Sequence, residues 1–267
     1  MTQTPLTEPT PQDGLCIGQT HGETRLLWLN LPKRRNALSP ELREELRVQL
    51  LAAIADDAIR AIVIAGVQGC FSAGGDISTM KGITSVAGRA RMQTAGALMQ
   101  TIISSPKPII AAVEGWCVGA GLSLAAACDI VVASQDAKFS LPFGKLGLIP
   151  DLASLYTLPP RIGTGRTKWL AFTRRVIDAK QALDWGLVEE AVATDAIQHA
   201  LTLADEVSQG APLTHAYSKE LMSRLPLTLP EFLAAERDTQ AILYTSEDFA
   251  EGCEAFFEKR APDFKGR

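Results

Sequence analysis

Short apolar runs alternate with longer helix-forming stretches through the first half of the chain. The run at 61–66 (Ala-Ile-Val-Ile-Ala-Gly) and the run at 108–113 (Pro-Ile-Ile-Ala-Ala-Val) are rich in β-branched residues, which is typical of buried strands. We expect a helix between them at about 86–104, followed by a helix at 119–127 and a strand at 129–133. This alternation predicts a parallel sheet and an α/β fold.

The segment before the first buried strand predicts a hairpin and a helix. Residues 15–19 and 24–31 are expected to pair as strands around the turn at His21-Gly22. Ser39 is a suitable N-cap for a helix, because Pro40 follows it at the first helical position. The buried face of that helix is predicted by an apolar stripe at Leu42, Leu46, Leu50 and Ile54.

Helical segments dominate the chain after Ile149, and the one strand signal there is the run at 188–192. We expect helices at about 152–158, 163–173, 178–185, 194–208, 212–224, 229–243 and 246–258. Residues 1–13 are rich in Thr, Pro and Gln with little to bury, so we expect a disordered tail there. The chain is thus predicted to comprise a tail at 1–13, an α/β core at 14–200 and a C-terminal helical region at 201–267.

Composition sets limits on the ligands. The chain of 267 residues is 46% hydrophobic, so it can bury a large core. Its net charge of -4 and its pI near 5.5 argue against nucleic acid as a partner, so an anionic ligand would need a local group of cations. Such groups occur at Lys33-Arg34-Arg35 and at Lys259-Arg260.

The cysteines and the apolar segments indicate where in the cell the protein is expected. The five cysteines form an odd set without metal-ligand spacing, and the first fifteen residues lack the apolar core of a signal peptide. We therefore expect a cytoplasmic protein without a metal site. Residues 108–134 are long and apolar enough to span a bilayer, but Glu114, Asp129 and several glycines interrupt them. A strand-helix-strand division explains the interruptions, so we expect no membrane association.

Two glycine turns are the candidate chemical feature. The strand at 61–66 leads into Cys70-Phe71-Ser72-Ala73-Gly74-Gly75-Asp76-Ile77, and the strand at 108–113 leads into Gly119-Ala120-Gly121 at the start of a helix. Turns of this kind leave backbone N–H groups uncovered, and two of them could donate to one carbonyl oxygen. The alternative is that each turn is only a tight connection that needs a positive φ.

These turns resemble those of the crotonase family, the enoyl-CoA hydratases and isomerases. The resemblance also includes Asn36-Ala37-Leu38-Ser39 and the closing Glu251-Gly252-Cys253-Glu254-Ala255-Phe256-Phe257-Glu258-Lys259-Arg260, and it extends from about Leu15 to the C-terminus. It implies a ββα spiral core with a C-terminal helical region that forms trimers or hexamers. It also implies an acyl-CoA substrate whose enolate is stabilised, and no cofactor beyond the coenzyme A moiety.

The resemblance assigns roles to particular residues. The oxyanion donors would be the N–H groups of Gly75 and Ala120. Contacts to coenzyme A would come from two loops and from the last helix, at Arg34, Arg35, Ala37, Ala73, Gly74, Asp76, Ile77, Phe256 and Lys259. The last two of these residues would reach the nucleotide from a neighbouring subunit.

The resemblance also bears on the reaction. The positions of the two hydratase glutamates are Ser123 and Phe143 here, and neither residue can transfer a proton as a carboxylate. Asp151 matches the single acid of the double-bond isomerases, which moves one proton between two carbons. We expect Phe143 and Leu148 to desolvate Asp151 and raise its pKa, and we expect Ser123 and Met80 to line the acyl pocket.

Other interpretations of these residues remain open at this point. Asp151 could activate water in a hydratase or lyase, could only cap a helix, or could lie in a non-catalytic acyl-CoA binding subunit. A hydrolase triad of Ser123, Asp151 and either His199 or His215 is the weakest alternative, because Ser123 does not directly follow its strand and Ala125 replaces the required glycine.

Overall fold

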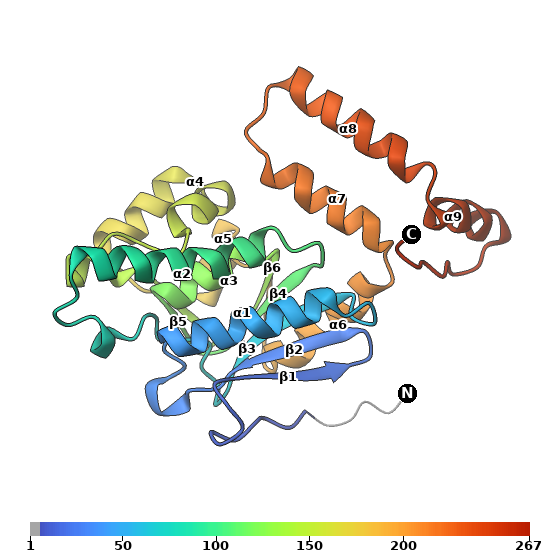
Figure 1. Cartoon of the computed structure of the whole chain (residues 1–267). Coiled ribbons are helices and arrows are strands. Elements are labelled where there is room, and N and C mark those ends of the chain that lie inside the picture. Colours follow the sequence, from blue (N-terminus) through green and yellow to red (C-terminus); the bar gives the residue numbers. More distant parts are fainter. Residues whose placement is uncertain (1–5) are drawn as a thin grey trace.

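A six-stranded sheet forms the centre of the molecule (Figure 1), and the structure, a computed structural model, describes residues 6–267. The first two strands of the sheet are antiparallel, and all the other neighbours are parallel. The predicted hairpin and parallel sheet are therefore confirmed. In spatial order the strands are β1 (Cys16–His21), β2 (Thr24–Leu29), β3 (Ala61–Gly66), β4 (Ile109–Val113), β6 (Ile130–Ser134) and β9 (Glu190–Val192).

A second, smaller sheet was not predicted. It consists of β5 (Trp116–Val118), β7 (Lys138–Ser140) and β8 (Ile177–Asp178), in the order β5-β7-β8. Its strands have two or three residues each, which is too short for a period-two pattern to be seen in the sequence.

The helices follow the predicted segments closely. Three short 3-10 helices of the described residues lie in loops that follow β2, β3 and β7: η1 (Pro32–Arg34), η2 (Ile77–Thr79) and η3 (Pro142–Leu146). The α-helices are α1 (Pro40–Ala55), α2 (Ser85–Ile103), α3 (Ala120–Ala127), α4 (Ser154–Thr173), α5 (Ala179–Trp185), α6 (Ala196–Ser208), α7 (Pro212–Ser223), α8 (Leu229–Leu243) and α9 (Glu247–Glu258). The two helices predicted at 152–158 and 163–173 both correspond to parts of α4, and the non-helical backbone of Gly163 kinks the element between them.

Both faces of the large sheet are buried. Leu27 and Leu29 of β2 point to the side that is covered by α1, α2 and α3, whereas Leu26 and Trp28 point to the side covered by α6. Successive residues of a strand face opposite sides, so both sets must be apolar when both faces are covered. This double burial explains why the strands appear as continuous apolar runs in the sequence.

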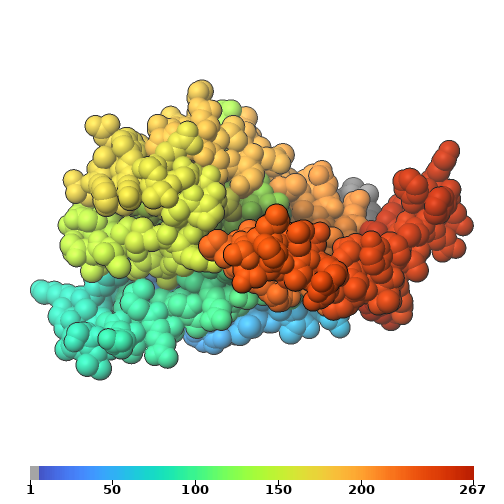
Figure 2. Space-filling view, turned by 90° about the horizontal axis from the view of Figure 1, so that it is seen from above, coloured from blue at the N-terminus to red at the C-terminus, as the bar shows by residue number. Residues whose placement is uncertain are grey.

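One helix crosses the predicted boundary between the core and the C-terminal region. The expected boundary at 200/201 falls inside α6, which packs on β2, β3, β4 and β6 and belongs to the core. Helices α7, α8 and α9 come after it, and α8 and α9 extend away from the core (Figures 1 and 2). The predicted segments at 194–208 and 212–224 look equally helical, so the sequence pattern does not show which of them packs on the sheet.

The described part of the predicted tail, residues 6–13, contacts the core. Gln19 Nε2 donates to the Thr7 carbonyl at 2.8 Å, and Asn30 Nδ2 donates to the Thr10 carbonyl at 2.7 Å. Leu6 packs against the apolar cluster on the α6 side of the sheet. Polar side chains of the core thus contact residues 6–13. The expected tail stays a prediction, and residues 1–5 lie outside the described residues.

The apolar segment at 108–134 is divided as the sequence predicted. It forms β4, β5, α3 and β6 in turn, and the two strands at its ends lie side by side in the large sheet. Among residues 6–267, no helix is both long and apolar enough to cross a membrane.

Two glycines in different surroundings, Gly121 and Gly96, give a matched test of how closely α3 packs against the segment around Ser72. A Cβ on Gly121 would lie 2.7 Å from Ser72 Cβ and 2.8 Å from the Ser72 carbonyl oxygen, whereas a Cβ on Gly96, inside α2, would meet nothing within 4 Å. We expect Gly121→Ala to lower the free energy of unfolding by about 1–3 kcal/mol through overpacking. Gly96→Ala should raise it by about 0.5–1 kcal/mol, because alanine favours an exposed helix interior.

Denaturant unfolding of the two variants and the parent chain measures both changes. A Gly121→Ala protein as stable as the parent would show that α3 does not approach the segment around Ser72 as closely as the structure places it.

Candidate active site

The two glycine turns lie against each other. Ser72 forms an isolated parallel bridge with Cys117, and Gly75 forms one with Leu38. A Cβ on Gly74 would lie 2.8 Å from the Val118 carbonyl oxygen and 3.6 Å from the Ala120 nitrogen. Gly74 has a φ of 104°, so glycine is required there both for its conformation and for this close approach.

Two backbone N–H groups remain open at this contact. The bridge to Leu38 uses the Gly74 carbonyl, which accepts from the Leu38 N–H at 2.7 Å, and the Gly74 N–H donates to Ser72 Oγ. Ala120 is the first residue of α3, and its N-cap, Gly119, has no side chain to cap the helix. Within residues 6–267, neither the Gly75 N–H nor the Ala120 N–H donates to a protein acceptor, so both can donate to an oxygen atom of a ligand.

Asn36 holds the first glycine turn in place, a role that the sequence analysis did not assign. It is fully buried, and its Nδ2 donates to the carbonyls of Val67 and Cys70 at 3.0 and 2.6 Å. Its own carbonyl accepts from Ser72 Oγ at 2.8 Å. The signal was present in the Asn36-Ala37-Leu38-Ser39 motif, but a buried asparagine cannot be recognised without its tertiary partners.

Asp151 lies in the loop before α4 and does not cap that helix. The N-cap of α4 is Ala153, which makes no side-chain cap, and only the Asp151 carbonyl accepts from the Ser154 N–H. The helix-cap alternative is therefore wrong. Asp151 Oδ1 is buried without a hydrogen-bond partner in residues 6–267, so this oxygen is available to a ligand.

The surroundings of Asp151 shift its pKa upward. Burial disfavours the charged carboxylate and raises the pKa of Asp151 above 3.8, while Arg43 and Arg91 act in the opposite direction. The expected direction of the shift is thus confirmed. A raised pKa brings a carboxyl group closer to the range in which it can both take up and return a proton.

The two arginines that act on Asp151 were not predicted from the sequence. Arg43 is buried in the first turns of α1, and the Nη2 atom of Arg91, on α2, is buried without a partner in the described chain. One signal was available, because Arg43 lies three and seven residues before Leu46 and Leu50 and therefore shares their face of the helix. A charged residue on the apolar face of a helix is a candidate for function.

Met80 and Phe143 lie next to the glycine turns. A Cβ on Gly75 would be 3.0 Å from Met80 Cε, and a Cβ on Gly119 would be 3.9 Å from the ring of Phe143. That these side chains line an acyl pocket stays a prediction. Leu148 is 47% exposed, although its N–H donates to the Phe143 carbonyl, so it covers less of the site than expected.

A hydrolase triad is excluded by the hydrogen bonds. The buried Ser123 Oγ donates to the Gly119 carbonyl at 3.2 Å. His199 pairs with Glu190 at 2.5 Å, and His215 contacts the Val207 carbonyl at 3.0 Å. The serine and the histidines therefore have separate structural partners, and Ser123 is a small helix residue beside the second glycine turn.

The predicted coenzyme A residues fall into two groups. Those of the two loops surround the first glycine turn: Arg34 forms an ion pair with Asp76, and the Ala73 N–H donates to the Arg35 carbonyl. Hydrogen bonds from Ser78, and then the pairing with Arg34, lower the pKa of Asp76. Ala37 is buried, and Ile77 is exposed.

The second group lies elsewhere. Phe256 and Lys259 are at the end of α9, far from the glycine turns of the same chain (Figure 1). The structure of one chain does not bring them to the candidate site.

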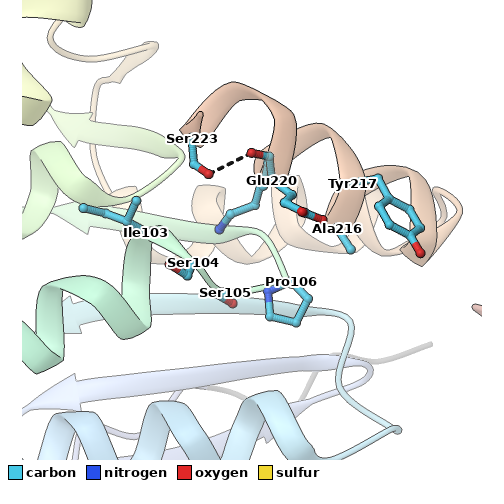
Figure 3. Close-up of a pocket in the computed structure, with 9 residues that line it drawn as sticks. Ile103, Ser104, Ser105, Pro106, Ala216, Tyr217, Glu220 and Ser223 are labelled. Atoms are coloured by element: carbon cyan, nitrogen blue, oxygen red, sulfur yellow. Dashed lines mark hydrogen bonds between the residues drawn. The ribbon is translucent and has the colours of Figure 1, made fainter. Parts of the chain in front are cut away.

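A separate hollow of about 270 Å³ lies between the end of α2 and α7 (Figure 3). Ser105 and Pro106 border it on one side, and Glu220 and Ser223 border it on the other. None of the predicted site residues lines it, so it is distinct from the glycine turns.

No metal centre emerges from the described part of the chain. Residues 6–267 contain no group of three His, Cys, Asp or Glu side chains that could hold an ion, and all five cysteines are free.

Comparisons with known proteins agree with this geometry. A family model described as "Enoyl-CoA hydratase/isomerase" matches residues 23–267. The chain is 38% identical over 251 residues to the "probable enoyl-CoA hydratase" of Rhizobium meliloti, covering 93% of this chain and 97% of that protein. It is 35% identical over 250 residues to the 1,2-epoxyphenylacetyl-CoA isomerase of Escherichia coli, covering 90% and 94%. A solved enoyl-CoA hydratase from Polaromonas sp. JS666 matches with a TM-score of 0.90 and 34% identity, covering 94% and 100%.

The chain belongs to the enoyl-CoA hydratase/isomerase family, the crotonase family, and has its α/β fold. The resemblance that the motifs predicted is confirmed. The protein is thus an enzyme of this family. Binding of an acyl-CoA substrate is consistent with membership of the family.

The electrostatic surroundings of Asp151 can be tested directly. We expect the side-chain carboxyl of Asp151 to titrate with a midpoint above pH 3.8. Carbon NMR of a labelled protein measures this midpoint. Arg43→Gln should move the midpoint further up, because it removes a cation that favours the carboxylate. Asp184→Asn, at an exposed helical pair with Lys180, is the control and should leave the midpoint unchanged. A midpoint at or below 3.8 in the parent protein would contradict the assignment.

Proposed function

We propose that the protein is an enoyl-CoA isomerase that moves a carbon-carbon double bond with one carboxylate. In this proposal the N–H groups of Gly75 and Ala120 bind the thioester carbonyl oxygen, and Asp151 carries the proton. The observation that supports it most is that the Asp151 carboxyl group, beside the loop of Phe143, has both a raised pKa and a buried, unpartnered oxygen.

The reaction needs one base that becomes one acid. With a 3-enoyl-CoA, the Asp151 carboxylate takes the proton from C2, and the C2–H electron pair moves into a dienolate whose negative charge lies on the thioester oxygen. The neutral Asp151 carboxyl then returns the proton to C4, so the double bond moves from C3–C4 to C2–C3. No other reactant is consumed, and Asp151 ends as a carboxylate.

The two N–H donors favour this step because they act on charge that develops during the reaction. The thioester oxygen is nearly neutral in the substrate and negative in the dienolate, so preorganised donors stabilise the transition state more than the bound substrate. Loss of one such donor typically lowers the rate by about 10²–10³-fold.

The other acid of the site is poorly suited to carry the proton. Asp76 lies in the first glycine turn, but it is held by Ser78 and Arg34, which lower its pKa. Ser123 and Phe143 cannot supply a second carboxylate. A pair of acids with pKa values shifted in opposite directions supports assigning proton transfer to the one that is shifted upward.

A hydratase is the second candidate function. The name of the Rhizobium meliloti relative favours it, whereas the Escherichia coli relative is named an isomerase. In a hydratase, Asp151 would activate a water molecule for addition to C3 of a 2-enoyl-CoA. The two reactions give different products from different substrates, so product analysis separates them.

We also propose that the C-terminal region joins copies of the chain into a homotrimer or a hexamer. Phe256 and Phe257 of α9 are 78% and 81% exposed, and a hollow of about 530 Å³ beside them is lined mainly by apolar side chains. Exposed apolar patches of this kind mark interaction surfaces. Association would also explain how Phe256 and Lys259 could serve the coenzyme A moiety of a neighbouring subunit.

Asp151→Asn tests the proton transfer. We expect it to lower kcat for isomerisation of a 3-enoyl-CoA by about 10²–10⁴-fold, the usual contribution of a general base, with acyl-CoA binding retained. In the parent protein, the acid limb of kcat/KM should lie above 3.8, because activity falls as Asp151 becomes protonated and its pKa is raised.

Asp184→Asn is the matched surface control for this experiment and should keep full activity. If Asp151→Asn kept full activity, isomerisation through Asp151 would be excluded. If neither 3-enoyl-CoA nor 2-enoyl-CoA were converted by the parent protein, the non-catalytic binding subunit would be the better interpretation.

A further inference from the structure

Two arginines act electrostatically on Asp151 but take no proton in the proposed reaction. Arg43, on α1, is 6% exposed, and Arg91 lies on the neighbouring helix α2 with its Nη2 atom buried. Both cations act electrostatically on Asp151, and Arg91 also acts on Arg43. These three side chains from three separate elements form one group, which we call the arginine cluster.

The arginine cluster has more donors than acceptors. Arg91 Nη2 and Asp151 Oδ1 are both buried without a hydrogen-bond partner among residues 6–267. Two acids act on Arg43, namely Asp151 and the exposed Glu41. Both act at a distance and not through hydrogen bonds. Because a buried donor nitrogen without an acceptor destabilises the folded state, the buried Arg91 Nη2 points to a ligand that supplies an acceptor.

The charges of the arginine cluster do not balance. With Asp151 ionised, the arginine cluster holds two cations and one carboxylate and so carries one positive charge, because Glu41, the other acid that acts on Arg43, is exposed to solvent and lies outside the cluster. During the proposed proton transfer Asp151 becomes neutral, and the excess becomes two. An anion of the substrate, held on the far side of the reacting carbons from coenzyme A, would neutralise part of this excess throughout the reaction.

We propose that Arg91 and Arg43 bind a carboxylate on the acyl chain, so that the preferred substrate is the coenzyme A thioester of an unsaturated dicarboxylic acid. The proposal rests on the proposed function to the extent that Asp151 marks where the reacting carbons lie. A guanidinium group matches a carboxylate geometrically through two parallel N–H···O bonds, so arginine is well suited to this recognition.

A role limited to Asp151 would have a different signature. If the arginines only kept Asp151 ionised and oriented, their loss would affect every acyl-CoA to the same extent. A carboxylate subsite instead requires a loss that depends on the substrate, so the test compares substrates that differ only in the terminal group.

The first measurement is binding of saturated thioesters, which have no double bond to move. Calorimetry would compare succinyl-CoA, adipyl-CoA and suberyl-CoA with butyryl-CoA, hexanoyl-CoA and octanoyl-CoA. We expect at least one dicarboxylic ester to bind about tenfold to hundredfold more tightly than its neutral counterpart, the usual range for a hydrogen bond to a charged group. Arg91→Gln should abolish this preference and leave binding of the neutral esters within about threefold.

Arg89→Gln is the matched control for Arg91→Gln. Arg89 lies two residues earlier on α2 and is exposed, and residues two apart on a helix do not share a face. The preference for the dicarboxylic ester should remain in Arg89→Gln and in Asp151→Asn, since neither removes the proposed donors.

The second measurement is turnover of the matching unsaturated thioesters, at a pH well above the acid limb of each variant. Arg91→Gln should lower kcat/KM for the dicarboxylic substrate by about tenfold to hundredfold more than it lowers kcat/KM for the neutral substrate, whose loss reports only the effect of Arg91 on Asp151.

Equal affinity for the two series in the parent protein would overturn the carboxylate subsite, as would a preference that survives both Arg91→Gln and Arg43→Gln. Because the saturated esters are not converted, a failure of the isomerase proposal leaves this binding result readable on its own.

Discussion

The close contact between the two glycine turns is the constraint on which the candidate site depends. The segment around Ser72 and Gly74 lies between the loop before α1 and the start of α3, with a bridge on each side. Side chains at Gly74 or Gly121 would collide with backbone atoms of the neighbouring segment. In this arrangement the Gly75 and Ala120 N–H groups have no acceptor among residues 6–267, so the fold and the proposed oxyanion site come from one packing.

Asp151 is balanced between two opposing influences. Burial raises its pKa, and the two arginines lower it. A carboxyl group that was buried alone would hold its proton too firmly to act as a base, whereas one paired directly with an arginine would release it too readily to act as an acid. The cations of the arginine cluster lie close enough to act on Asp151 without forming an ion pair, which supports a group that must do both.

The sequence predicted elements whose signal is local and missed those whose signal is tertiary. The strands at 61–66 and 108–113 and the Ser39 cap were predicted because periodicity and capping are visible within a few residues. The small sheet was missed because its strands are too short to have a period. Residues 6–13 were expected to be disordered because their partners, such as Asn30, are distant in sequence. For the site, the motifs indicated Gly75, Ala120 and Asp151, but the roles of Asn36 and Arg91 depend on burial, which a single sequence does not reveal.

The central sheet and the C-terminal helices differ in how much apolar surface they leave exposed. In the described residues, both faces of the sheet between α1 and α6 are buried within the chain. Helices α8 and α9 leave large apolar side chains exposed, Leu229 and Phe256 among them. Removing apolar surface from water is favourable, so association of these helices with another copy of the chain would stabilise the helices without altering the sheet. In that arrangement each core supplies the reacting groups, and the proposed contacts of Phe256 and Lys259 to coenzyme A come from the neighbour.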